Sequence, residues 1–262
     1  MIKLLACDID GTLLPLGADA LSERVIELLN TITKKGVKLA IASGRSLYDI
    51  KRLFSGLERK PCIIADDGAL AVGEGKVIYS RPLPLGDMSE LLRVYKNNGT
   101  PIIFSTSAER LIMENGADRD RLAKCELYGK IARIEELSQL KNEAVYKMSF
   151  LWDGEIPARP PVPQNSRIYY RKDGWLEYVP KFADKGLALS ALQSLYYADS
   201  FNTLVLGNET NDIGMAKKAR YSVCIGNSCP QLASVSTVVS DSALPILEKL
   251  AFSPEKFSLP RY

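Results

Sequence analysis

The stretch 2–12 reads Ile-Lys-Leu-Leu-Ala-Cys-Asp-Ile-Asp-Gly-Thr. Its first six residues form a short, largely apolar run, which predicts a buried parallel strand over 2–7. Two carboxylates, Asp8 and Asp10, follow at once, with Gly11 to let the chain turn. Open α/β sheets bind ligands beyond the carboxyl ends of their strands, so these residues predict a small acidic site. Aspartate and glycine are also common at ordinary strand ends, so this stretch alone leaves the alternative open.

Strands and helices alternate after this stretch and again near the C-terminus. Ser22 is placed to cap a helix whose apolar positions 25, 28, 29 and 32 share one face, and Gly36 provides its end. This alternation predicts an α/β fold with a doubly wound parallel sheet. The other expected elements are strands over 37–42, 61–65, 203–206, 221–225 and 237–239, and helices through 47–53, 184–198, 212–219 and 243–251.

The middle of the chain has a different texture. From about Pro82 to Pro180 the pattern favours strands without regular crossover helices. Asp173-Gly174 predicts a hairpin turn, and the proline-rich stretch 158–164 predicts a loop. We therefore expect an α+β module over 82–181 inserted into a core made of 1–81 and 182–262. One large mixed domain is the alternative.

Composition excludes several classes of function. The 262 residues include no histidine, which excludes Ser-His-Asp and Cys-His catalysis and zinc sites with imidazole ligands. Acid–base chemistry must then use carboxylates, Lys, Tyr, Cys or metal-bound water. With 34 basic and 31 acidic residues the net charge is +3, so we expect neither a nucleic-acid nor a membrane partner. Five scattered cysteines without a CxxC pair, and no secretory or membrane-spanning run, favour a reducing cytoplasm.

Four short polar motifs follow one another along the chain: Asp8-Ile9-Asp10-Gly11-Thr12, Ser43-Gly44-Arg45, Asp184-Lys185-Gly186 and Gly207-Asn208-Glu209-Thr210-Asn211-Asp212. In order and spacing they resemble the motifs of the haloacid dehalogenase (HAD) superfamily of phosphotransferases, the fourth as an imperfect match to G-D-x-x-N-D. The resemblance covers essentially the whole chain, and the strand-rich insertion between the second and third motifs is similar to the type C2B cap of the Cof-type, type IIB branch. Ile225-Gly226-Asn227 also fits that branch.

The resemblance implies a phosphatase with Asp8 as nucleophile, forming an aspartyl-phosphate. It implies that Asp10 protonates the leaving alcohol and then activates water. Two unit charges about 4 Å apart repel by roughly 4 kcal/mol at an effective dielectric near 20, so a carboxylate cannot attack a phosphate dianion without compensating cations. Mg²⁺ and Lys185 would supply them. The implied phosphate- or substrate-binding residues are Ile9, Ser43, Gly44, Arg45, Lys185 and Asn211, and the implied metal ligands are Asp8, Asp10, Asn208 and Asp212.

Two positions depart from the family pattern. Asn208 stands where the branch usually has a metal-binding Asp, and Asp66-Asp67 stand where relatives often carry Asn. Arg45 could meet substrate or form a helix-surface salt bridge. The expected substrate is a small phosphorylated metabolite, with sugar phosphates first. A phosphomutase of the phosphomannomutase type and a phospho-ligand-binding protein without turnover are the alternatives, and monomer and homodimer both stay open.

Overall fold

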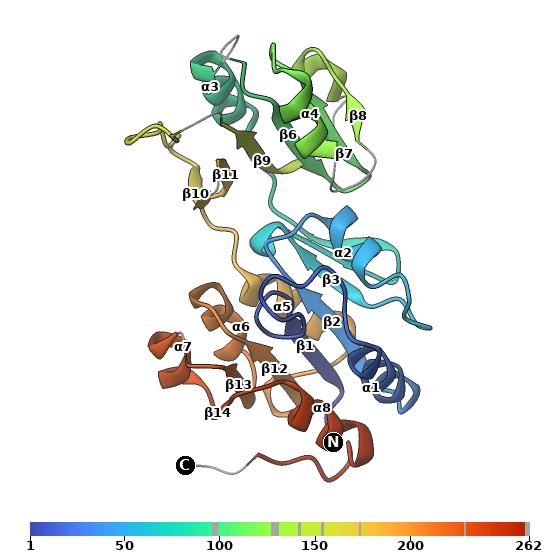
Figure 1. The fold of residues 1–262 in the computed structure, drawn as a ribbon. Helices are drawn as coiled ribbons and strands as arrows, with labels where there is room; N and C mark the ends of the chain where they lie inside the picture. Colours follow the sequence, from blue (N-terminus) through green and yellow to red (C-terminus); the bar gives the residue numbers. More distant parts are fainter. Residues whose placement is uncertain are drawn as a thin grey trace. The chain divides into compact units, whose positions relative to one another are not determined.

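The computed structural model describes residues 1–95, 99–126, 131–140, 143–152, 155–172, 174–227 and 229–259. The chain divides into two compact units (Figure 1). Unit 1 contains Met1–Gly44, Ile50–Tyr79 and Asp184–Tyr262, and unit 2 contains Arg45–Asp49 and Ser80–Ala183. The sequence placed the boundaries after 81 and after 181 and did not anticipate the short segment 45–49 in unit 2. The role of unit 2 as a cap stays a prediction.

Unit 1 is built on an eight-stranded sheet in the order β14-β13-β12-β1-β2-β3-β4-β5. The pairs from β14 to β3 are parallel, and β4 pairs antiparallel with β3. This parallel, helix-flanked sheet confirms the predicted α/β class. The strands are β1 (Leu4–Asp8), β2 (Lys38–Ala42), β3 (Cys62–Ala65), β4 (Leu70–Gly73), β5 (Lys76–Ser80), β12 (Thr203–Gly207), β13 (Tyr221–Ile225) and β14 (Val238–Ser240).

The helices of unit 1 begin and end where the sequence provides the signals. The Ser22 hydroxyl accepts a hydrogen bond from the Val25 N–H, and Gly36 has φ +89° just beyond the end of α1. The helix predicted over 212–219 is shorter in the structure, where α6 spans Ile213–Ala216 and follows a 3₁₀ turn over Thr210–Asp212. The helices are α1 (Glu23–Lys34), α2 (Leu47–Leu53, whose first three residues belong to unit 2), α5 (Lys185–Leu195), α6 (Ile213–Ala216), α7 (Pro230–Val235) and α8 (Leu244–Phe252).

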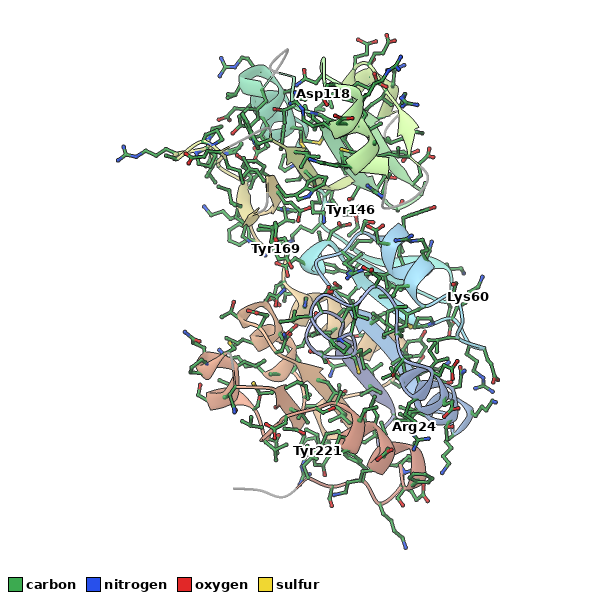
Figure 2. All side chains as sticks on the ribbon, in the orientation of Figure 1. Arg24, Lys60, Asp118, Tyr146, Tyr169 and Tyr221 are labelled. Carbon is green, nitrogen blue, oxygen red and sulfur yellow. The ribbon has the colours of Figure 1, made fainter. Side chains whose placement is uncertain are left out.

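Figure 2 adds the side chains to this framework. Arg24 of α1, labelled there, forms an exposed ion pair of 2.8 Å with Glu248 of α8. The apolar faces of α5 and of the strands form the core of unit 1, which includes Leu4, Ala40, Ile64 and Leu189. The sheet thus holds its strand ends in fixed positions relative to one another.

Unit 2 contains a six-stranded sheet in the order β10-β11-β9-β6-β7-β8. Neighbouring strands in this order pair antiparallel, except β7 and β8, which are parallel. The predicted hairpin is confirmed as β10 and β11, although Asp173 itself lies outside the described residues. Two helices also occur, which the sequence analysis missed, although Met88, Leu91 and Tyr95 carry a helical spacing. The elements are α3 (Leu85–Tyr95), β6 (Ile102–Thr106), β7 (Arg110–Met113), α4 (Arg119–Glu126), β8 (Ala132–Arg133), β9 (Val145–Leu151), β10 (Ser166–Lys172) and β11 (Trp175–Pro180).

The two faces of this second sheet differ in chemistry. One face carries Phe104, Met148, Phe150 and Tyr178, which pack with apolar residues of α3. The opposite face is apolar at one end, where Cys125 of α4 joins Ile103, Ile112 and Leu151. The other end of that face is polar, as the strand registers show. We call this end the polar half-face, and it consists of Ser105, Arg110, Lys147, Ser149 and Glu177.

The described part of the chain contains no helix whose length and apolarity would let it cross a bilayer.

Candidate active site

The residues of all four motifs follow strands, or begin a helix, at one edge of the unit 1 sheet. Asp8 ends β1 and lies level with Ala42 of β2, so Ser43 is the next residue on that side. On the other side Cys7 lies level with Leu206 of β12, so Asn208 follows just beyond Asp8. Figure 1 shows β1 and β2 side by side in the sheet. The carboxyl edge of the parallel sheet therefore gathers these residues, as the sequence predicted.

Lys185 joins the third motif to the first and the fourth. It is the first residue of α5, whose N-cap Asp184 accepts a hydrogen bond from the Leu187 N–H (2.8 Å). Its ammonium nitrogen lies 2.7 Å from Asp8 Oδ1 and 2.7 Å from Asp212 Oδ1. Only 1% of Lys185 is exposed. One buried cation thus holds two carboxylates together.

Asp212 is engaged through both of its carboxylate oxygens. While Oδ1 contacts Lys185, Oδ2 accepts hydrogen bonds from the Asn208 N–H (3.0 Å) and the Glu209 N–H (3.2 Å). A methyl group built on Gly207 would lie 2.6 Å from this carboxylate, so glycine is needed there. Asp212 therefore anchors Lys185 and the loop that carries Asn208.

The electrostatics of Asp8 follow from this burial. Desolvation and the nearby Asp212 charge raise the pKa of Asp8 to about 7. Lys185, by its charge and its hydrogen bond, and the Ile9 N–H act in the opposite direction and lower that pKa. The cluster contains two carboxyl groups, Asp8 and Asp212, and one ammonium group, Lys185. With both carboxyl groups ionised its net charge is −1, which would favour a further cation there.

The turn after β1 places Asn208 beside Gly11. Gly11 has φ +80°, and a methyl group built on it would lie 2.2 Å from Asn208 Nδ2. The Thr12 hydroxyl donates to Asn208 Oδ1 (3.3 Å), and the Ile9 carbonyl accepts the N–H groups of Thr12 and Leu13. The Asn208 amide is therefore buried against the first motif, and its role as a metal ligand stays a prediction. Asp10 lies in the same turn and is half-buried.

The second motif is split between the two units. Ser43 is buried, and its N–H donates to the Ile64 carbonyl (2.9 Å). Gly44 ends the first segment of unit 1, whereas Arg45 belongs to unit 2 together with 46–49. In that short segment Asp49 lies 3.7 Å from the buried Arg110 guanidinium of the polar half-face.

Asn211 of the fourth motif contacts a residue that sequence reasoning had left without a role. Its amide Nδ2 donates a 2.9 Å hydrogen bond to Asp67 Oδ1. Asp67 follows β3 at the same sheet edge. The signal was present in the sequence, since Asp66-Asp67-Gly68 is an acidic, glycine-containing turn after a buried strand. Its partner could not be predicted from spacing.

A metal site made only of acidic, cysteine or histidine ligands is not present among the described residues, where no three such side chains are suitably grouped. The oxygen donors near Asp8 are instead mixed. Asp8 and Asp212 supply carboxylates, and Asn208 supplies an amide oxygen beside the first motif.

Comparisons with known proteins agree with this architecture. An HMP-PP phosphatase of Cronobacter sakazakii is 24% identical over 240 residues, which cover 88% of this chain and 87% of that protein. A longer relative from Streptococcus pyogenes is 24% identical, and this chain spans 56% of its length.

Solved structures match the fold over nearly the whole chain. A haloacid dehalogenase-like hydrolase from Bacteroides thetaiotaomicron has a TM-score of 0.75 at 23% identity and covers 95% of this chain and 100% of its own. A HAD subclass IIB sugar phosphatase has a TM-score of 0.67 at 17% identity, covering 96% and 99%. The family model for haloacid dehalogenase-like hydrolases matches residues 5–244, and with the four motifs gathered around Asp8 the chain belongs to this family of enzymes.

Proposed function

We propose that this hydrolase is a Mg²⁺-dependent phosphatase that releases phosphate from a small phosphorylated metabolite through an aspartyl-phosphate on Asp8. The observation that carries the proposal is the buried cluster in which Lys185 contacts Asp8 and Asp212 at 2.7 Å each. A buried carboxylate at a sheet edge can serve as a nucleophile only if cations offset its charge and that of the phosphate. Lys185 is fixed in the position where that offset is needed.

The reaction has two steps in which atoms and charges balance. An Asp8 carboxylate oxygen forms a bond to phosphorus while the bond from phosphorus to the leaving oxygen breaks, and Asp10 gives that oxygen a proton. Water then attacks the phosphorus of the acyl phosphate while Asp10 takes back a proton. This releases inorganic phosphate and restores Asp8. The half-buried position of Asp10 suits a group that exchanges protons with both the leaving alcohol and water.

Ser43, Gly44, Ile9 and Asn211 are the proposed phosphate-binding groups. The position of Ser43 supports this role, because Ser43 follows Ala42, the residue of β2 that pairs with Asp8. Backbone N–H groups and side-chain donors fixed at a strand edge stabilise charge that develops on phosphate oxygens. Arg45 is kept as a proposed substrate contact on the resemblance alone.

The donor set fits Mg²⁺ by its chemistry. Mg²⁺ prefers oxygen ligands and is bound through one or two carboxylates with waters and substrate phosphate. Asp8, the Asp10 carbonyl and the Asn208 amide oxygen would hold it, while Asp212 is occupied with Lys185 and two backbone amides. When bound, the ion would neutralise negative charge on Asp8 and on the phosphate.

Within unit 2, the polar half-face carries side chains suited to binding a hydroxyl-bearing ligand, which agrees with a sugar phosphate as the first substrate candidate. Glu177 accepts a hydrogen bond from the Ser149 hydroxyl (2.8 Å) and lies 3.3 Å from Lys147 Nζ. Charged and hydroxyl side chains of this kind hydrogen-bond to the hydroxyl groups of a polyol. Relatives named as an HMP-PP phosphatase and a sugar phosphatase indicate small phosphorylated substrates of more than one kind.

Phosphate release from p-nitrophenyl phosphate and a panel of phosphorylated metabolites, with and without Mg²⁺, tests the proposal. Asp8→Asn should abolish turnover, and Asp10→Asn should slow it by about 10²–10⁴-fold. Asp19→Asn, which changes an exposed aspartate outside the site, is the matched control. Near wild-type release by Asp8→Asn would contradict the covalent mechanism. An isomerised product would instead indicate a mutase, and binding without turnover would indicate a phospho-ligand receptor.

A further inference from the structure

The turn that contains Asp67 is strained and lies against the start of α5. Asp66, Asp67 and Gly68 have φ values of 49°, 57° and 86°, all in the left-handed region. Such conformations are unfavourable for most residues and persist only where surrounding contacts hold them. A methyl group built on Gly68 would lie 2.3 Å from the Asp184 carbonyl carbon and 2.4 Å from Lys185 N. The turn is therefore fixed in position beside the residue that contacts Asp8.

Asp67 makes two contacts from this position. Its backbone N–H donates to the Ser43 carbonyl (3.1 Å), and its Oδ1 accepts from Asn211 Nδ2 (2.9 Å). Only 2% of Asp67 is exposed. Ser43 and Asn211 belong to different motifs, and both are proposed phosphate-binding residues. One residue thus connects two groups that would act on the same ligand.

We propose that Asp67 is a positioning residue for phosphate, which holds the Asn211 amide through its carboxylate and the Ser43 backbone through its N–H. This inference rests on the proposed function, because it assigns Asp67 a part in that same site. It also explains how an additional carboxylate can lie near a site for a phosphate dianion. Its oxygen points to Asn211 as a hydrogen-bond acceptor.

The chemistry of the amide makes orientation decisive. An asparagine NH₂ can donate two hydrogen bonds, so Asn211 can bind Asp67 and a phosphate oxygen together. The Asp67 carboxylate can only accept hydrogen bonds, so it can pair with the NH₂ group of the Asn211 side chain but not with its carbonyl oxygen. Asp67 therefore favours the amide orientation in which the NH₂ group also faces the phosphate site. In the reversed orientation the amide carbonyl would face the phosphate and repel it. Hydrogen-bond donors that are already oriented need not reorganise when the charged ligand binds, so no free energy is spent on reorienting them.

A double-mutant cycle with inorganic phosphate as the probe tests this role. Asp67→Gly removes the carboxylate while tolerating the left-handed backbone, and Asn211→Ala removes the amide. Each single change should raise the inhibition constant of inorganic phosphate, measured against p-nitrophenyl phosphate, about tenfold. The double variant should lie within about twofold of Asn211→Ala, because Asp67 acts through Asn211. Glu74→Gly is the matched control, since Glu74 has φ +51° but lies exposed in the turn between β4 and β5.

Asp67→Asn provides a conservative variant that keeps one acceptor oxygen and the backbone preference. It should raise the phosphate inhibition constant about threefold, and this loss should vanish in the Asn211→Ala background. This second cycle decides the question if Asp67→Gly does not fold. Additive effects, or an unchanged inhibition constant with only a lower unfolding midpoint, would show a purely structural role and overturn the inference.

The same experiment separates this inference from the proposed function. If Asp8→Asn is inactive while the Asp67 and Asn211 effects are additive, only the positioning role fails. If Asp8→Asn still releases phosphate, the proposed mechanism fails whatever the cycle shows.

Discussion

Replacing Lys185 by methionine should leave two buried carboxylates near each other without a cation. Lys185 Nζ lies 2.7 Å from Asp8 Oδ1 and from Asp212 Oδ1, so these oxygens are at most about 5.4 Å apart, twice that distance. Their repulsion at that separation is about 3 kcal/mol at an effective dielectric of 20. Each of the two attractions that the variant loses, from Lys185 to Asp8 and to Asp212 at 2.7 Å, is about 6 kcal/mol at the same effective dielectric.

The net loss must be smaller than these terms, because the variant no longer pays the desolvation of a buried ammonium. Removing one partner of a buried ion pair typically costs about 3–5 kcal/mol, and we expect the free energy of unfolding to fall by that amount. Urea unfolding at pH 8 in EDTA measures it, since no divalent ion can then replace the lysine. Lys34→Met is the matched control. Its pair with Glu58 is equally short at 2.7 Å, but 58% and 55% of those side chains are exposed, so the loss should stay below about 1 kcal/mol.

Asp212→Asn provides a sharper test, because its effect on the free energy of unfolding should change sign when Lys185 is replaced. In the wild-type background Asp212→Asn should destabilise the protein, because Lys185 loses a partner. In the Lys185→Met background the same change should stabilise it, because it removes both the repulsion between Asp8 and Asp212 and the proton uptake by Asp8 that this repulsion would otherwise force. Equal losses for Lys185→Met and Lys34→Met, or an Asp212→Asn effect with the same sign in both backgrounds, would refute this electrostatic account.

Three further predictions concern other residues. Asn208→Asp should tighten Mg²⁺ binding, measured by calorimetry, by on the order of 1–3 kcal/mol, while Asn30→Asp in α1 should not. Gly68→Ala should lower the free energy of unfolding by several kcal/mol because the methyl group would meet the backbone of Asp184, whereas Gly75→Ala, at φ +78° with open space around it, should cost only about 1 kcal/mol. Glu177→Gln should lower the free energy of unfolding by about 1–3 kcal/mol, measured in urea, because Lys147, 3.3 Å from Glu177 and largely buried, would lose its partner.

Much of the catalytic edge was predictable because its residues directly follow apolar strands. The buried runs ending at Asp8 and at Ala42 fix the register of a parallel sheet, so Asp8 and Ser43 had to meet at one edge. Lys185 was likewise predictable at the start of a capped helix. The Asp67–Asn211 hydrogen bond was not, because it joins residues 144 positions apart through a left-handed turn whose shape depends on contacts with α5.

Asp212 shows why a residue's identity does not determine its role. The sequence offered it as a metal ligand, and aspartate is a suitable ligand. In the structure its oxygens contact Lys185 and two backbone N–H groups, and its part in metal binding stays a prediction. In unit 2, the alternation of Lys147 and Ser149 with Met148 and Phe150 was visible in the sequence. What could not be predicted was which neighbouring strands would extend that polar row, because this depends on strand order.

The charges around Asp8 lead to a last prediction. Asp8, Asp212 and Asp67 lie near the proposed phosphate site, whereas Lys185 is the cation that contacts the cluster in the described structure. Without the metal ion, a phosphate dianion would be repelled by these carboxylates. Without the phosphate, a divalent ion near Asp8 would lack the phosphate oxygen that completes its set of ligands. Each should therefore bind more tightly when the other is present, by the same factor, because linkage is reciprocal. Calorimetric titration of Mg²⁺ with and without saturating inorganic phosphate, corrected for their association in buffer, should show at least a tenfold gain, about 1.4 kcal/mol. A Mg²⁺ affinity that phosphate leaves unchanged would mean that the two do not share this site.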